Sequence, residues 1–80
     1  MGIVVVVQAF VFIRTGAGKA ASVAEQAGKL SGCRLACMVT GRYDVVVLIE
    51  AEDLKKLTEA ILSKIHTIDG VERTETAIVV

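Results

Sequence analysis

The hydrophobic positions along this chain alternate between continuous runs and helical spacings. Nearly every residue from Ile3 to Ile13 is Val, Ile, Phe or Ala, which predicts a strand buried on much of both faces. After the glycine-rich segment 15–18, apolar residues recur three and four positions apart, at Ala20, Val23, Ala24, Ala27 and Leu30. This spacing predicts a helix rich in alanine, which can approach a sheet closely.

Two further apolar runs, 33–40 and 43–51, flank the dipeptide Gly41-Arg42, which predicts a β-hairpin. Asp53 is then placed to cap a second helix. The apolar side of that helix is expected at Leu54, Leu57, Ile61 and Ile65. Asp69-Gly70 predicts a turn, and 71–80 predicts a last strand in which Thr74 and Thr76 share one face.

The predicted order is therefore βαββαβ within one domain spanning residues 1–80. With a central hairpin and right-handed crossovers, this order indicates an α+β, ferredoxin-like fold. Its four-stranded antiparallel sheet carries two helices on one face, so the strands should alternate between apolar and polar residues. Val4–Val7 and Val45–Ile49 do not alternate. We therefore expect a second copy to cover the other face in a sheet-to-sheet homodimer.

Composition narrows the functional classes. The 80 residues carry nine Lys plus Arg and nine Asp plus Glu, a net charge of zero, and few aromatic residues. Direct binding to DNA is therefore not expected, because such binders concentrate basic charge. The apolar run at 3–13 is too short for a membrane span and has no cationic segment before it, which predicts a cytoplasmic protein.

No pattern supports catalysis, a cofactor or a metal. The segment Thr15–Lys19 lacks the spacing of a phosphate-binding loop. Cys33 and Cys37 are expected about 13 Å apart along one side of a strand, too far to bridge each other or to share one metal ion. The single histidine, His66, has no partners in sequence that make it a metal ligand or a general base. We therefore predict that the protein is not an enzyme.

The polar groups in apolar surroundings are the candidate ligand-binding residues: Gly41, Arg42, Tyr43, Asp44, Thr74 and Thr76. A glycine turn offers backbone N–H groups, and a carboxylate, a cation and hydroxyl groups can recognise a zwitterionic amino acid. The alternative is purely structural, with Gly41 forming the turn, Asp44 closing it, and the threonines serving as ordinary strand residues.

Two segments carry a resemblance to a known family, Val39-Thr40-Gly41-Arg42-Tyr43-Asp44-Val45-Val46-Val47-Leu48-Ile49-Glu50 and Ile68-Asp69-Gly70-Val71-Glu72-Arg73-Thr74-Glu75-Thr76-Ala77-Ile78-Val79. They resemble the C-terminal effector-binding (RAM) domain of the Lrp/AsnC transcription regulators. The resemblance covers about residues 36–80, and it is only topological before them. It implies dimers, commonly assembled into octamers of four dimers, that hold an amino acid between dimers at the six residues named above. Family members usually carry an N-terminal helix-turn-helix. This chain is expected to begin directly in its first strand, without such a domain, so it is similar to the stand-alone effector domains of the family.

Two functions remain open at this level. The first is an amino-acid-binding regulatory domain that acts through a partner, such as a full-length Lrp/AsnC-type regulator. The second is a structural oligomerisation module without a ligand. The sequence names neither the amino acid nor the partner, and it leaves the final oligomer size and the role of Cys33 and Cys37 open.

Overall fold

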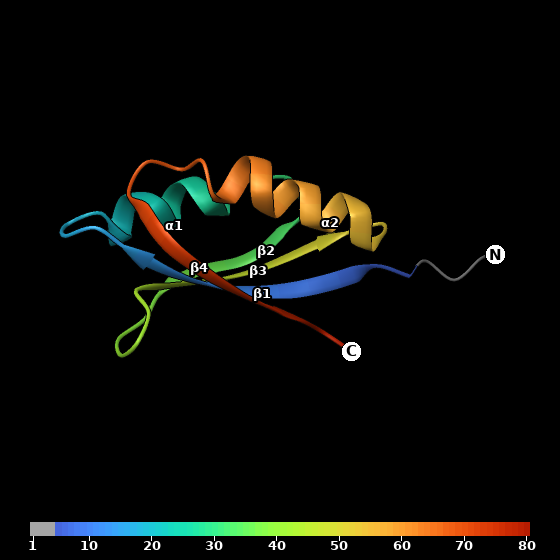
Figure 1. Ribbon diagram of the computed structural model, residues 1–80, viewed down its shortest axis with the longest axis horizontal. Coiled ribbons are helices and arrows are strands. Elements are labelled where there is room, and N and C mark those ends of the chain that lie inside the picture. Colours follow the sequence, from blue (N-terminus) through green and yellow to red (C-terminus); the bar gives the residue numbers. More distant parts are fainter. Residues whose placement is uncertain (1–4) are drawn as a thin grey trace.

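The computed structural model describes residues 5–80 and has the predicted element order (Figure 1). The strands are β1 (Val7–Thr15), β2 (Cys33–Met38), β3 (Val45–Ala51) and β4 (Val71–Ile78). The helices are α1 (Ala20–Gly28) and α2 (Leu54–Ala60), and α2 continues into a π-helical turn, η1 (Ile61–Ile65). The first strand was expected at 3–13 and instead begins at Val7 and ends at Thr15. Residues 3 and 4 of that prediction lie outside the described residues.

The strands form one antiparallel sheet in the order β2-β3-β1-β4, which confirms the ferredoxin-like prediction. Both helices lie on the same side of this sheet (Figure 1). The central strands pair through Val11 opposite Val47, and β4 pairs with β1 through Thr76 opposite Val11. Strands β2 and β4 are the two edges of the sheet.

The core lies between the sheet and the helices. Alternate residues of β1 and β3 point to the helices and are fully buried, while Leu57, Ile61 and Ile65 reach down from the second helical segment. Each fully buried side chain of this size contributes roughly 1.5–3 kcal/mol. The sheet residues of the core are Ala9, Val11, Ile13, Val45, Val47 and Ile49.

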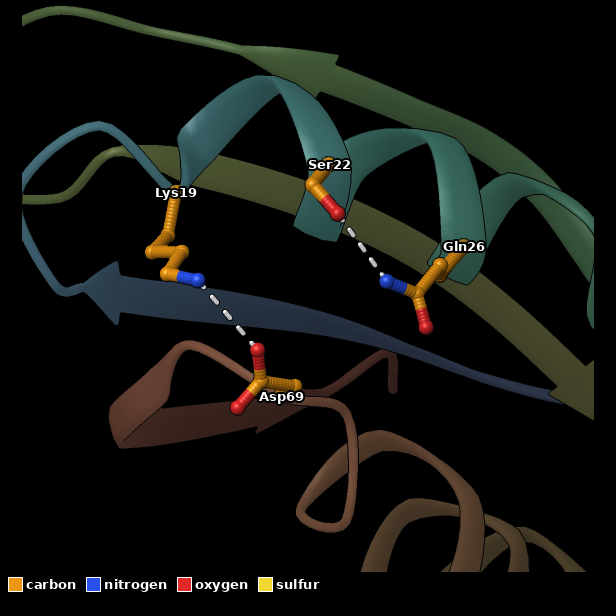
Figure 2. Close-up of polar contacts among 4 residues, drawn as sticks. All are labelled: Lys19, Ser22, Gln26 and Asp69. Carbon is orange, nitrogen blue, oxygen red and sulfur yellow. Dashed lines mark hydrogen bonds and ion pairs between the residues drawn. The ribbon is translucent and has the colours of Figure 1, made fainter.

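Helix α1 has small residues where it meets β2. A Cβ atom on Gly28 would lie 3.7 Å from the Cβ of Ala36, so the helix and strand pack closely. Just before the helix, Lys19 Nζ lies 3.4 Å from Asp69 Oδ2, in the turn that precedes β4 (Figure 2). Both side chains are exposed, so this pair adds little to stability. The pair shows that the segment before α1 lies next to the turn before β4.

Helix α2 begins as predicted. Asp53 has extended backbone angles, and its side chain accepts a hydrogen bond from the Lys56 N–H at 2.8 Å. At the other end the helix widens, and the His66 N–H donates to the Ile61 carbonyl five residues earlier, at 3.0 Å. The widened turn keeps both Ile61 and Ile65 in the core.

A β-bulge at the start of β2 corrects the prediction for the two cysteines. Cys33 pairs with Ile49, whereas Leu35 already pairs with Leu48, so the register shifts between them. Cys33 therefore packs against the core on the helix side, and Cys37, opposite Val46, belongs to the other face. The expectation that both lie along one side of the strand is wrong. Both cysteines are free.

The sheet face away from the helices has an apolar centre. Phe10 and Leu35 are 36% and 47% exposed, and between them in the sheet lies Leu48, which pairs with both. Phe12 and Val46 form the next pair along the strands. Beyond this centre the face becomes polar at both ends, with Gln8 and Glu50 at one end and Arg14 and Arg73 at the other.

Candidate functional site

The loop between β2 and β3 is held by hydrogen bonds that converge on Asp44. The Asp44 carbonyl accepts from the Val39 N–H at 2.9 Å, and the Asp44 N–H donates to the Ile13 carbonyl at 2.9 Å. The Asp44 carboxylate atom Oδ2 also accepts from the Thr15 N–H at 2.8 Å. Asp44 thus fastens the loop to the end of β1.

Gly41 lies at the tip of this loop with a φ of +121°, a backbone conformation that residues with a Cβ atom rarely adopt. Nothing lies within 4 Å of the position where a Cβ atom would stand. The turn therefore needs glycine for its backbone angle, and its surroundings are open to solvent or to another molecule.

On its helix side, the loop borders an open hollow of about 710 Å³. Asp44 and Thr40 provide the polar part of its lining, and Ala20, Met38 and Val39 provide the apolar part. A carboxylate beside apolar side chains can hold an ammonium group while an aliphatic chain packs next to it.

On the opposite side of the sheet, Tyr43 and Arg42 contact residues from β1 and β4. The Tyr43 hydroxyl donates to Glu75. The centroids of the Tyr43 and Phe12 rings are 5.6 Å apart. The hydrogen bond to Glu75, followed by partial burial and the nearby carboxylate charge, raises the pKa of the Tyr43 phenol. Arg14 donates to the Arg42 carbonyl, so β1 also holds this part of the loop.

Thr74 and Thr76 share one face of β4, as predicted. This face is the helix side of the sheet, because they lie opposite the core residues Ile13 and Val11. They line a groove of about 440 Å³ between α2, η1 and β4. Thr74 Oγ1 lies 2.5 Å from His66 Nε2, so the histidine at the end of η1 is part of this groove. The remaining lining residues are Thr58, Ile61, Leu62 and Ile78.

One chain does not bring the six predicted residues together. Asp44 borders the hollow near β2, while Gly41 lies at the tip of the same loop. Arg42 and Tyr43 line the opposite face, and Thr74 and Thr76 line the groove near β4. Sequence reasoning missed Arg14 and Glu75, whose side chains hydrogen-bond to the loop because the pairing of β1 with β3 and β4 brings them there. It also did not connect His66 with Thr74, although the groove residues Leu62 and His66 share the spacing of one helical turn.

The structure also bears on three other kinds of site, namely a metal site, a membrane span and a reactive cysteine. Within residues 5–80, no group of three His, Cys, Asp or Glu side chains is arranged to hold a metal ion. In the same residues, no helix is long and apolar enough to cross a membrane. Burial raises the pKa of the Cys33 thiol, opposed by a weaker effect of a backbone hydrogen bond at Leu35, and this makes Cys33 less reactive.

Comparison with known proteins identifies close relatives of this domain. Residues 8–80 match the Lrp/AsnC ligand binding domain family. A helix-turn-helix-type transcriptional regulator of Pyrococcus abyssi is 36% identical over 70 residues, which cover 88% of this chain and 44% of the regulator. The chain thus spans less than half the length of that curated relative.

Two solved structures have the same fold. A hypothetical protein from Pyrococcus horikoshii is 34% identical, with a TM-score of 0.87 over 92% of this chain and 89% of that one. AsnC from E. coli is 28% identical, with a TM-score of 0.85 over 92% of this chain and 50% of AsnC.

Proposed function

The chain belongs to the Lrp/AsnC ligand-binding domain family, and from this membership we propose that it is a cytoplasmic, amino-acid-binding regulatory domain. The family match over residues 8–80 is the observation that carries the proposal. The matched relatives are transcription regulators rather than enzymes.

The apolar centre of the helix-free sheet face is exposed in a single chain, which favours assembly with a second copy. Phe10, Phe12, Leu35 and Leu48 form a patch that a second copy covers by packing face to face, as sheets do in sandwiches. The patch has polar groups at both ends. An apolar centre with a polar rim is the usual composition of a protein interface.

The effector pocket is completed between copies. The hollow beside Asp44 lies near the β2 edge, and the groove beside Thr74 and Thr76 lies near the β4 edge. When the hollow of one copy meets the groove of another, all polar groups needed for an amino acid come together. Such a contact joins two different surfaces, and repeated contacts of this kind form a ring when the rotation between copies closes. A ring of four dimers is the assembly we propose.

Within this pocket each polar group has one role. Backbone N–H groups at the Gly41 turn hold the ligand carboxylate, and Asp44 Oδ1 holds its ammonium group, because Oδ2 already accepts from Thr15. Thr74 and Thr76 contact the ligand side chain. Arg42 and Tyr43 support the loop from the other face, where the Tyr43 hydroxyl donates to Glu75.

Calorimetric titration with the common amino acids tests this function. A ligand should release or absorb heat saturably, and Asp44→Asn should weaken its binding by roughly ten- to a hundredfold, because a charge-assisted hydrogen bond is lost. Thr74→Val with Thr76→Val should change which side chain is preferred. Since Asn can still accept from the Thr15 N–H, the loop is retained in Asp44→Asn.

The second candidate is a structural module without a ligand, and the hydrogen bonds of Asp44 favour it. In that case no amino acid gives heat, and Asp44→Asn leaves assembly unchanged.

For either function we propose that this domain regulates by co-assembling with a full-length Lrp/AsnC-type regulator, which would provide the DNA contacts. Mixing the two proteins should then give a mixed oligomer in native mass spectrometry.

A further inference from the structure

Three of the four arginines of the chain meet at one end of the helix-free sheet face. Arg14 on β1 pairs directly with Arg73 on β4, and Arg42 comes from the loop between β2 and β3. Together with Tyr43 they line a cavity of about 310 Å³. Within residues 5–80, the cavity is therefore lined by three arginines and one tyrosine.

These arginines have no carboxylate partner in the described part of the chain. The ion pairs within residues 5–80 involve Lys19, Lys29, Lys56 and the fourth arginine, Arg34. The Glu75 carboxylate accepts a hydrogen bond from the Tyr43 hydroxyl. In a chain with zero net charge, this end of the sheet therefore has a local excess of positive charge.

We propose that Arg14, Arg42, Arg73 and Tyr43 form an anion-binding site for a small oxyanion with two or more negative charges, a phosphoryl group or a polycarboxylate. Guanidinium groups match the oxygens of such anions with paired N–H donors. Three cations close together repel one another, and a singly charged ligand would compensate only part of that repulsion. The site goes beyond the proposed amino-acid function.

Contacts with neighbouring residues hold the loop residues that line the cavity. Arg14 donates to the Arg42 carbonyl, and Tyr43 is held by Glu75 and by its contact with Phe12. The site shares its loop with the proposed amino-acid pocket but lies on the opposite side of the sheet from Thr74 and Thr76. An anion here would therefore occupy a different surface from the amino acid.

Calorimetric titration of the full chain with pyrophosphate and, separately, with citrate tests the site, with ionic strength held constant by NaCl and without any amino acid. We expect saturable binding of at least one anion, weakened about tenfold or more in Arg73→Gln and in Arg14→Gln. Lys55→Gln is the matched control, because it removes one exposed positive charge from α2, which lies on the opposite side of the sheet from the cavity (Figure 1). It should bind as the wild type does. Pyrophosphate binding alone assigns a phosphoryl ligand, and citrate binding alone assigns a polycarboxylate.

Three results would overturn the proposal. These are an absence of saturable binding, an equal loss of affinity in Lys55→Gln, and a fall in oligomer mass in Arg73→Gln without a change in anion affinity. The last result would mean that carboxylates of a second copy neutralise the arginines. Failure of this site leaves the amino-acid function untouched, because that function is tested by Asp44→Asn and the threonine variants.

Discussion

At the scale of single residues, Asp44 shows how a side chain can have a structural role before any ligand arrives. Its backbone and its carboxylate together make three of the hydrogen bonds that fix the loop between β2 and β3. The sequence presented two interpretations of this residue, a ligand contact and a turn-closing group. The observed bond from the Thr15 N–H supports the second role and leaves one carboxylate oxygen for the first.

Replacing Asp44 by alanine should therefore destabilise the chain more than replacing it by asparagine. Asp44→Ala leaves the partly buried Thr15 N–H without an acceptor, which costs about 1–3 kcal/mol. Asp44→Asn keeps an acceptor oxygen and should cost less than about 1 kcal/mol. Thermal unfolding at one protein concentration, followed by circular dichroism, compares the two. Equal losses would show that the carboxylate does not hold the loop.

Tyr43 provides a direct optical readout of its own environment, because the chain has one tyrosine and no tryptophan. Its pKa is raised by the hydrogen bond to Glu75, so absorbance at the wavelength of tyrosinate should titrate above the ordinary value of about 10. In Glu75→Gln the midpoint should move down toward that value. Since the folded pKa is the higher one, the stabilising contact is complete below pH of about 10 and is lost as pH rises through the raised pKa. An unchanged midpoint in Glu75→Gln would contradict the contact.

At the scale of elements, the two loops next to β2 depend on glycine for different reasons. Gly32 has a φ of +89°, and a Cβ atom there would lie 2.4 Å from the Glu50 carbonyl oxygen. Gly41 has a φ of +121° but open space around it. The first glycine is needed for both backbone angle and close approach, and the second for backbone angle alone.

Gly32→Ala should accordingly be more destabilising than Gly41→Ala. Both variants incur backbone strain of about 1–3 kcal/mol, and only Gly32→Ala must also displace β3 from the preceding loop. A further loss of about 1 kcal/mol would lower the melting temperature by roughly 4–8 °C in a domain of this size. Thermal unfolding of the two variants side by side measures the difference. If Gly41→Ala melts at the same or a lower temperature, the close approach at Gly32 is not limiting.

Most elements could be predicted from apolar spacing, and the exceptions have physical causes. Leu57, Ile61 and Ile65 are each four residues apart, and in a straight α-helix each such step drifts by about 40° from the core direction. The π-helical turn compensates for this drift, but spacing alone does not distinguish it from a regular helix. The bulge at β2 was equally hidden, because a single extra residue leaves no signal in a run of mostly apolar residues.

At the scale of the whole molecule, the candidate site was less predictable than the fold. Thr74 and Thr76 were correctly placed on one face, since strand alternation determines it. The meeting of Arg14 with Arg73 depends on the register of two strands that are far apart in sequence. Whether the hollow and the groove meet depends on further copies of the chain, which no pattern within one chain reports.

The exposed apolar face leads to a prediction about assembly. Leu48→Glu places a charge between Phe10 and Leu35, and a buried unpaired charge is strongly unfavourable. Light scattering should show a dimer or larger oligomer for the wild type and a monomer for Leu48→Glu. Leu54→Glu, at an exposed leucine on α2, is the control and should leave the mass unchanged. A wild type that stays monomeric at micromolar concentration would remove both the dimer and the pocket between copies.

The two edge strands of the sheet differ in how well they resist aggregation. Unpaired strand edges are templates for growth into fibrils, and charged side chains on an edge oppose that growth. Strand β4 carries Glu72, Arg73 and Glu75, whereas Arg34 is the only charged residue of β2, which also exposes Leu35 and Met38. When assembly leaves β2 uncovered, intermolecular sheet should therefore grow from β2, and storage at high concentration would benefit most from a second charge on that strand.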